Sequence, residues 1–288
     1  MSRVLVTGHN GYIGDHLFKE LRRLNHNVLG VDIKSGYSLQ DCWEKRYKEI
    51  LDFCPEYLFH LACWPRVGYS VENPYDTMKN NVLSTTAALE IARKCKTKRF
   101  IFSSSSAIYG NGDGPENPYA LHKKMSELEC ILYSKIFNLD TVCLRYFNVY
   151  SEDQKADGPY ATAIANWMDY IRARKNPFIT GDGNQKRDMV HVKDIVSANL
   201  FCMNYEYDFK GQNFDVGTGT NISLNEIKQI VNEYFPEVNF DIKPDRPNEV
   251  ENTLADTNSL RKLGWVAKVS SYDGIHKCFK DLRKEINK

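Results

Sequence analysis

The sequence predicts an α/β protein built on a doubly wound parallel sheet, with a smaller α/β lobe toward the C-terminus. Two observations support this fold class. Strand-like apolar runs alternate with helix-like segments through the first half of the chain, which is typical of a parallel sheet covered on both faces. At the N-terminus a glycine-rich turn joins the first strand to the first helix, as in the Rossmann-type folds that bind dinucleotides.

The first strand–turn–helix unit carries three glycines at a fixed spacing. The apolar run 4–6 predicts a buried strand, and a helical pattern follows the turn. In such a unit Gly8 permits the tight turn, Gly11 lets the backbone approach a pyrophosphate, and Gly14 lets helix and strand pack closely. The amide groups at the start of the helix would then face the phosphates.

The second strand predicts the identity of the cofactor. The run 28–31 ends at Asp32, which is 18 residues after Gly14. A carboxylate at this place hydrogen-bonds the adenosine ribose and repels a 2′-phosphate, so we expect NAD as the cofactor. The neighbouring cation Lys34 leaves NADP as the alternative.

The remaining elements follow in chain order. Strands are expected at 56–62, 99–103, 141–145 and 213–216, and helices at 42–53, 75–94, 119–137, 160–174, 193–205 and 223–234. The passages 179–183 and 189–191 predict a strand–loop–strand unit. We expect residues 1–150 to form the NAD-binding domain, to which 187–222 partly return, and residues 151–186 and 223–288 to form the substrate lobe.

Composition excludes several classes of protein. The net charge of +1 gives no reason to expect nucleic acid or a membrane surface as a partner, and the basic run 93–99 follows a helix whose C-terminus favours cations. Apolar runs are too short to cross a membrane, and the first strand leaves no room for a signal peptide. The eight cysteines form no C-x-x-C pair. We therefore expect a cytoplasmic protein in a reducing compartment, without a metal site.

A second informative stretch pairs a tyrosine with a lysine. Tyr119 and Lys123 lie one helical turn apart on the same face. A lysine ammonium at that distance stabilises a phenolate, so we expect the pKa of Tyr119 to lie below its usual value of about 10. Such a tyrosine can act as a general base on a substrate hydroxyl. The pair follows a serine-rich strand end at 102–110.

Further motifs extend along nearly the whole chain. They are His60-Leu61-Ala62, Asn80-Asn81-Val82, 144–150, 181–183, Arg187-Asp188, 246–250 and Leu263-Gly264-Trp265. With the glycine turn and the Tyr–Lys pair, they resemble the extended short-chain dehydrogenase/reductases. Within that superfamily the chain most resembles the NAD-dependent nucleotide-sugar epimerases of the UDP-glucose 4-epimerase type.

This resemblance implies roles for individual residues. Ser105, Tyr119 and Lys123 match the catalytic residues of the family. The implied cofactor-binding residues are Gly8, Asn10, Gly11, Tyr12, Ile13, Gly14, Asp32, Ile33, Leu61, Ala62, Cys63, Asn81, Ser103, Tyr119, Lys123, Tyr146 and Phe147. The implied substrate-binding residues are Ser105, Ser106, Tyr119, Asn148, Arg187, Arg246 and Glu249, the two arginines neutralising the diphosphate.

The resemblance also implies a reaction. Tyr119 takes the proton of a sugar 4-hydroxyl while a hydride passes to tightly held NAD⁺, and return of the hydride to the other face of the 4-keto sugar completes C4 epimerisation. A UDP-hexose is the expected substrate, although other nucleobases and sugars stay open. The alternatives are an NAD(P)-dependent ketosugar reductase and a non-catalytic NAD-binding protein. Helices 75–94 and 119–137 match the pair that forms the family's homodimer.

Two positions narrow the chemistry and one widens the substrate range. Dehydratases of the family place Asp-Glu after the catalytic serine or threonine, where this chain has Ser106 and Ala107, and this difference favours plain hydride chemistry. Relatives with a large residue at the position of Thr253 exclude N-acetylated sugars, so the small threonine predicts that N-acetylhexosamines are also accepted. Ser105 and Tyr119 are only 14 positions apart, which is a shorter loop than relatives usually carry.

Overall fold

The computed structural model describes residues 1–36, 39, 46–156, 162–244 and 250–288. The described chain forms two compact units, each with its own hydrophobic core. The first unit contains Met1–Tyr146 and Val196–Phe214, and the second contains Phe147–Ile195 and Asp215–Lys288. Within the described ranges, no helix is both long and apolar enough to span a bilayer.

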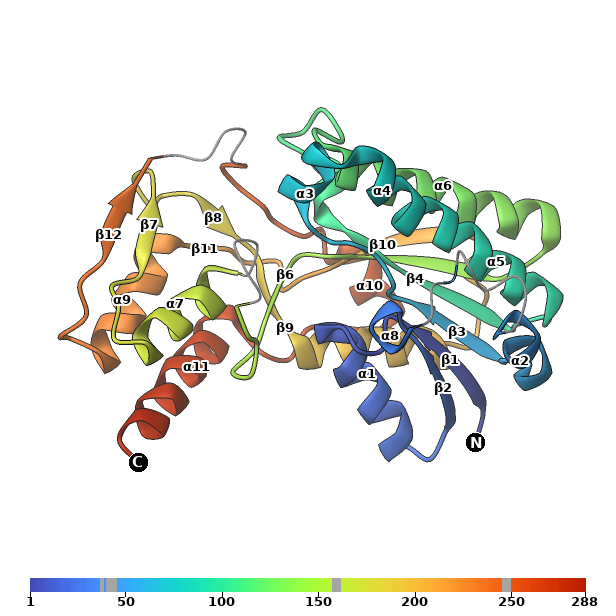
Figure 1. Cartoon of the computed structure of the whole chain (residues 1–288), viewed down its shortest axis with the longest axis horizontal. Coiled ribbons are helices and arrows are strands. Elements are labelled where there is room, and N and C mark those ends of the chain that lie inside the picture. Colours follow the sequence, from blue (N-terminus) through green and yellow to red (C-terminus); the bar gives the residue numbers. More distant parts are fainter. Residues whose placement is uncertain (37–38, 40–45, 157–161, 245–249) are drawn as a thin grey trace. The chain divides into compact units, whose positions relative to one another are not determined.

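The first unit is built on a six-stranded sheet with the order β10-β5-β4-β3-β1-β2 (Figure 1). The strands are β1 (Arg3–Thr7), β2 (Asn27–Val31), β3 (Tyr57–His60), β4 (Arg99–Ser105), β5 (Thr141–Tyr146) and β10 (Gln212–Val216). The pairings of β1 with β2 and β3, of β3 with β4, and of β4 with β5 are all parallel. The predicted doubly wound α/β fold class is thereby confirmed.

Helices cover both faces of this sheet, with α5 and α6 on one side and α1 and α8 on the other (Figure 1). The helical segments are α1 (Tyr12–Arg23), η1 (Ile33–Ser35), α2 (Arg46–Phe53), α3 (Val67–Glu72), α4 (Pro74–Met78), η2 (Lys79–Leu83), α5 (Ser84–Lys94), η3 (Ser106–Tyr109), α6 (Pro118–Phe137) and α8 (Val192–Asn204). The central strands are apolar on both faces because both faces are buried. On β4, Phe100, Ile101 and Phe102 are at most 1% exposed.

Several element boundaries differ from the sequence prediction, and two of the differences have a clear structural cause. The helix expected at 75–94 begins at Pro74 and contains one π-helical turn, η2, between α4 and α5. Strand β4 continues two residues beyond 103 because Ser104 and Ser105 pair in register with Arg145 and Tyr146 of β5. The described part of the helix expected at 42–53 is α2, and residues 42–45 lie outside the described residues.

The second unit packs helices around a core that contains Tyr150, Trp167 and Phe279. Its elements are β6 (Asn148–Tyr150), α7 (Ala163–Arg172), β7 (Phe178–Thr180), β8 (Lys186–Arg187), β9 (Met189–His191), β11 (Ile222–Ser223), α9 (Leu224–Tyr234), β12 (Asp241–Lys243), α10 (Asn258–Leu263) and α11 (Ser271–Ile286). The strands pair as β6–β9 and β7–β12, both parallel, and as β8–β11, antiparallel. The predicted N-cap Ser223 forms a capping box with Glu226 at the start of α9.

Candidate active site

The glycine turn at the carboxyl end of β1 has no room for a side chain at Gly8 or Gly14. Gly8 adopts a left-handed φ of +74°, and a Cβ there would lie 2.7 Å from the Ala62 nitrogen. A Cβ on Gly14 would lie 2.0 Å from the carbonyl oxygen of Gly8, so α1 can approach β1 only if this residue is glycine. Gly11 is the N-cap of α1 and supplies no capping side chain. These features fit the diphosphate of a dinucleotide, whose oxygens would accept from the first amides of α1.

Asp32 is held at the end of β2 by backbone amides. Its Oδ2 accepts from the Asn10 nitrogen at 2.9 Å and its Oδ1 from the Lys34 nitrogen at 2.8 Å. The residue is 6% exposed, and each carboxylate oxygen keeps a further lone pair. This fixed carboxylate beside the glycine turn fits the expected ribose contact. Its charge disfavours a 2′-phosphate.

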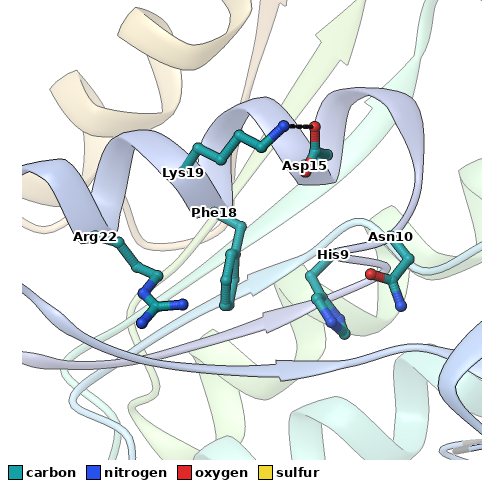
Figure 2. Close-up of a pocket in the computed structure, with 6 residues that line it drawn as sticks. All are labelled: His9, Asn10, Asp15, Phe18, Lys19 and Arg22. Carbon is teal, nitrogen blue, oxygen red and sulfur yellow. Dashed lines mark hydrogen bonds and ion pairs between the residues drawn. The ribbon is translucent and has the colours of Figure 1, made fainter.

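A pocket lies along α1 next to this turn (Figure 2). It is lined by His9, Asn10, Asp15, Phe18, Lys19 and Arg22. Figure 2 shows Lys19 bound to Asp15, and that ion pair measures 2.6 Å. The His9 ring occupies the space over Gly30, where a Cβ would come within 2.5 Å of it. The pocket shares only Asn10 with the predicted site, so it flanks the cofactor turn and carries no catalytic group.

The residues after β3 are held in place by Asn81. This asparagine lies in the π-helical turn η2 and is 3% exposed. Its Oδ1 accepts from the Trp64 nitrogen at 2.7 Å, and its Nδ2 donates to the Trp64 carbonyl at 3.3 Å. The side chain therefore fixes the loop that contains Leu61, Ala62 and Cys63. π-Helical turns often occur at functional sites because they redirect one side chain.

His60, the last residue of β3, is the centre of a buried chain of hydrogen bonds. The Ala62 nitrogen donates to Thr7 Oγ1, which leaves the Thr7 hydroxyl proton to donate to His60 Nδ1 at 2.7 Å. Thr85 donates its own proton to the Asn81 carbonyl, so it accepts from His60 Nε2 at 3.1 Å. The chain requires the neutral Nε2–H tautomer. Burial and, to a smaller extent, the Lys123 charge lower the pKa of His60 to about 3.

The predicted catalytic residues meet where β4 ends and α6 begins. Ser105 Oγ accepts from the Ala107 nitrogen at 3.2 Å, and the Ser105 hydroxyl also hydrogen-bonds the Tyr119 phenol. Asn117 caps α6 by accepting from the Ala120 nitrogen at 2.9 Å, which places Tyr119 in the first turn. The Tyr119 nitrogen donates to Ser70 Oγ at 3.1 Å.

Lys123 lies one turn further along α6 and is 3% exposed. Its ammonium donates to the Ser103 carbonyl at 2.6 Å and lies 4.9 Å from the centre of the Phe102 ring. The expected lowering of the Tyr119 pKa is wrong for this arrangement. Burial raises the pKa of Tyr119 and the Cys63 thiol raises it further, while the hydrogen bond with Ser105 opposes them. The spacing of tyrosine and lysine could not reveal how deeply the phenol is buried.

Other predicted cofactor-binding residues have mainly internal partners. The Tyr146 hydroxyl lies 3.0 Å from Ser103 Oγ, and Asn199 Nδ2 donates to that hydroxyl at 2.8 Å. Burial raises the pKa of Tyr146 to about 12. The Phe147 nitrogen donates to the Val216 carbonyl at 3.2 Å, and the Phe147 side chain is buried.

The remaining predicted residues of the first unit lie near the carboxyl ends of its parallel strands, where ligands bind in such sheets. They are Tyr12 and Ile13 at the start of α1, Ile33 in η1 after β2, and Ser106 at the start of η3.

Of the predicted substrate-binding residues, Asn148 and Arg187 belong to the second unit, whereas Ser105, Ser106 and Tyr119 belong to the first. Asn148 begins β6, and its Nδ2 donates to the Asp188 carbonyl at 3.1 Å and to Thr253 Oγ1 at 3.2 Å. Arg187 lies on β8, where its Nη1 donates to the Lys186 carbonyl at 2.9 Å. The structure thus brings Asn148, Arg187 and Thr253 into one neighbourhood. Arg246 and Glu249 lie outside the described residues.

The family model for the NAD-dependent epimerase/dehydratase family matches residues 4–217 of this chain. The chain belongs to that family. Membership confirms the resemblance, and it confirms NAD as the cofactor. The binding of NAD by the glycine turn and Asp32 stays a prediction, which their geometry fits.

Relatives of this epimerase/dehydratase chain match over nearly its full length. A putative UDP-glucose 4-epimerase of Methanocaldococcus jannaschii is 32% identical over 94% of this chain and 95% of its own. Two solved structures each align with a TM-score of 0.89 over 99% of both chains. They are a UDP-N-acetylglucosamine 4-epimerase from Methanobrevibacter ruminantium, in complex with UDP-N-acetylmuramic acid, at 27% identity, and a UDP-glucose 4-epimerase from Thermotoga maritima, with UDP-glucose, at 29%.

Sequence reasoning missed two polar groups of this family member. His60 entered only as part of a motif, although a histidine that ends an apolar strand is a signal of a buried hydrogen-bonding role. Glu127 was not singled out, yet its side chain is fully buried eight residues after Tyr119. Its position, one helical turn beyond Lys123 on the face that carries Tyr119 and Lys123, could have revealed it.

Proposed function

We propose that this chain catalyses the NAD-dependent C4 epimerisation of a nucleotide sugar, with a UDP-hexose as substrate. The observation that carries the proposal is the hydrogen bond between Ser105 and Tyr119, with Lys123 one turn further along α6. These groups lie in the same compact unit as the glycine turn and Asp32. The names of the relatives and structures reported above support a sugar nucleotide as substrate.

Each residue has a distinct part in the proposed reaction. When bound, NAD supplies the acceptor and later the donor of a hydride at the sugar C4. Ser105 hydrogen-bonds the sugar 4-hydroxyl, and Tyr119, in its phenolate form, accepts the proton of that sugar hydroxyl as the 4-keto sugar forms. The positive charge of NAD⁺, when bound, would favour this phenolate against the neutral phenol that burial alone favours. The Lys123 ammonium stabilises negative charge on the Tyr119 and Ser105 hydroxyl groups. Tyr119 then returns the proton when the sugar has presented its other face.

The residues after Ser105 favour epimerisation over dehydration. Elimination of water needs a second acid or base beside the reacting carbon. Ser106 and Ala107 occupy the two following positions at the start of η3, and neither side chain carries a carboxylate. Within an epimerase/dehydratase family, this pair supports reversible hydride transfer without elimination.

The two compact units divide the proposed work. The first unit would bind NAD and carry the catalytic groups, and the second would bind the nucleotide sugar through Asn148 and Arg187, with Arg246 and Glu249 contributing. Thr253 beside Asn148 has a small side chain, and this supports acceptance of N-acetylhexosamines as well as hexoses. A protein that converts UDP-glucose but leaves UDP-N-acetylglucosamine untouched would contradict this part of the proposal.

The direct test incubates the purified protein with UDP-glucose, UDP-galactose and their N-acetyl and uronic acid counterparts, without added NAD. We expect at least one pair of sugars that differ only at C4 to interconvert, and chromatography of the products measures this. A Tyr119→Phe variant should retain bound NAD and lose conversion by about 100-fold or more, because only the proton acceptor is removed.

The other outcomes each point to a different function. No conversion without cofactor, followed by net reduction of a ketosugar when NADH is added, would replace the epimerase with a reductase. No conversion in either assay, with NAD bound and Tyr119→Phe indistinguishable from the parent protein, would indicate a non-catalytic NAD-binding protein.

A further inference from the structure

The carboxyl end of β4 is bonded to α6 at three successive residues. The bonds join the Ser103 carbonyl to Lys123, the Ser104 hydroxyl to Glu127, and the Ser105 hydroxyl to Tyr119. The three partners on α6 follow one another at intervals of four residues, so they lie on one face of the helix. Two of the three bonds involve proposed catalytic groups, and the third involves Glu127.

Glu127 is tightly bound although it is fully buried. Its Oε1 accepts from Ser104 Oγ at 2.7 Å and from Arg145 Nε at 2.8 Å, and its Oε2 accepts from Arg145 Nη2 at 2.9 Å. This two-point contact between a guanidinium and a carboxylate fixes both distance and angle. It links α6 to β5 at the level of the β4 terminus.

Arg145 extends the link to the segment that follows Ser105. Its Nη1 donates to the Tyr109 hydroxyl at 2.7 Å, and its guanidinium lies 5.2 Å from the centre of the Tyr109 ring. Tyr109 ends the η3 turn, whose N-cap is Ser105. The ion pair therefore holds Ser105 from both sides, through Ser104 before it and through Tyr109 after it.

A buried ion pair is a poor means of adding stability, since desolvation of the charges offsets their attraction. It does fix geometry, and proton transfer is sensitive to geometry at the scale of an ångström. We propose that Glu127 and Arg145 are positioning residues that set the separation between the Tyr119 phenol and the Ser105 hydroxyl. This inference rests on the proposed function of Tyr119 and Ser105.

The chain offers a matched control for the test. Arg99 and Asp140 form a second buried ion pair at the opposite end of β4, with 2.5 Å between Nε and Oδ2 and side chains 7% exposed. Arg99→Lys and Arg145→Lys each keep the charge and lose the planar fork. Both should lower the melting temperature, and only Arg145→Lys should affect the catalytic pair.

We expect Arg145→Lys and Ser104→Ala to lower kcat by about 10- to 100-fold while KM for the sugar nucleotide and the bound NAD stay near those of the parent protein. Arg99→Lys should keep the parental kcat per folded molecule. Equal losses of kcat in the two lysine variants, or a parental kcat in Ser104→Ala, would overturn the proposal. Ser104→Ala removes one hydroxyl, so it keeps the test available where Arg145→Lys does not fold.

A crystal structure of Ser104→Ala gives a readout that does not depend on turnover. We expect a longer separation between Tyr119 Oη and Ser105 Oγ than in the parent protein. An unchanged separation would contradict the positioning role. This measurement stands even where the parent protein converts none of the sugars, which separates failure of this inference from failure of the proposed function.

Discussion

At the scale of single residues, His60 shows how the fold constrains a charge state. Its two ring nitrogens are committed to Thr7 and Thr85, one as acceptor and one as donor. A second ring proton would face the proton that Thr7 donates, in a site with no exposure to water. The neutral form is therefore the only one compatible with the packed strands.

This constraint predicts acid lability. The pKa of His60 is about 3 in the folded protein and about 6.5 in an unfolded chain, so only the unfolded state binds the proton between these values. The unfolding free energy should be unaffected above pH 6.5 and fall below it, by up to about 1.4 kcal/mol per pH unit. Denaturant unfolding from neutral pH to pH 4 measures this slope.

The control compares two histidine variants. His60→Gln should lose stability at neutral pH and lose most of the acid slope, because glutamine does not titrate. His26→Gln should keep the slope, since His26 is only partly buried. A parental slope in His60→Gln would show that other groups cause the acid lability.

The glycines and Asp32 were predictable from sequence because their roles depend on backbone space and on position along one strand–turn–helix unit. The partners of Tyr146 and Asn81 were not predictable. Ser103 and Asn199 reach Tyr146 from other elements, and Asn81 bonds a loop 17 positions away. Such contacts depend on how strands align, which the sequence of each segment does not contain.

At the scale of elements, α6 joins a structural role to a proposed catalytic one. Asn117 caps it, Pro118 occupies its first turn, and Tyr119 follows directly. A proline at this position is preorganised for a helix start and lacks only an amide that would be unpaired. The phenol therefore sits on a turn whose geometry depends on one capping side chain.

Removal of this cap should affect both stability and rate. Asn117→Ala is expected to lower the unfolding free energy by about 1 kcal/mol and to lower kcat, since the first turn carries Tyr119. Ser270→Ala removes the equivalent cap of α11, where Ser270 accepts from the Asp273 nitrogen at 3.0 Å. It should cost similar stability and leave kcat unchanged; an equal loss of kcat in both variants would contradict this reasoning.

Most elements were predictable from apolar periodicity, and the exceptions have physical reasons. The π-helical turn at Lys79–Leu83 inserts extra backbone into a helix without changing its composition, so it leaves no pattern to read. The last two residues of β4 are serines, which do not favour strands, and their extended form comes from pairing with β5.

At the scale of the whole molecule, α6 presents an apolar stripe to solvent. Leu121, Leu128, Leu132 and Ile136 are between 49% and 60% exposed. Their spacing of seven, four and four residues places them along one side of the helix. An apolar stripe of this length favours burial against another protein surface, and it supports the proposed homodimer.

We expect light scattering at micromolar concentration to give twice the chain mass of 33.2 kDa. Leu128→Glu should give a single chain mass, because a carboxylate would be buried at the centre of the interface. Ile242→Glu changes an apolar residue on β12 that is 68% exposed, against 55% for Leu128, and should leave the dimer intact. A monomeric parent protein would refute the homodimer.

The buried Arg99 has a consequence for the order in which the chain is made. Its guanidinium donates to the carbonyls of Cys202, Tyr205 and Tyr207, which lie more than 100 positions downstream. During translation β4 leaves the ribosome long before these partners exist. At about 5 to 20 residues per second, the roughly 60 residues between Tyr146 and Tyr207 take about 3 to 12 seconds to synthesise. For that interval the Arg99 guanidinium has its ion-pair partner Asp140 but lacks its three carbonyl acceptors, so the base of the sheet is completed only when the segment 202–207 has been made.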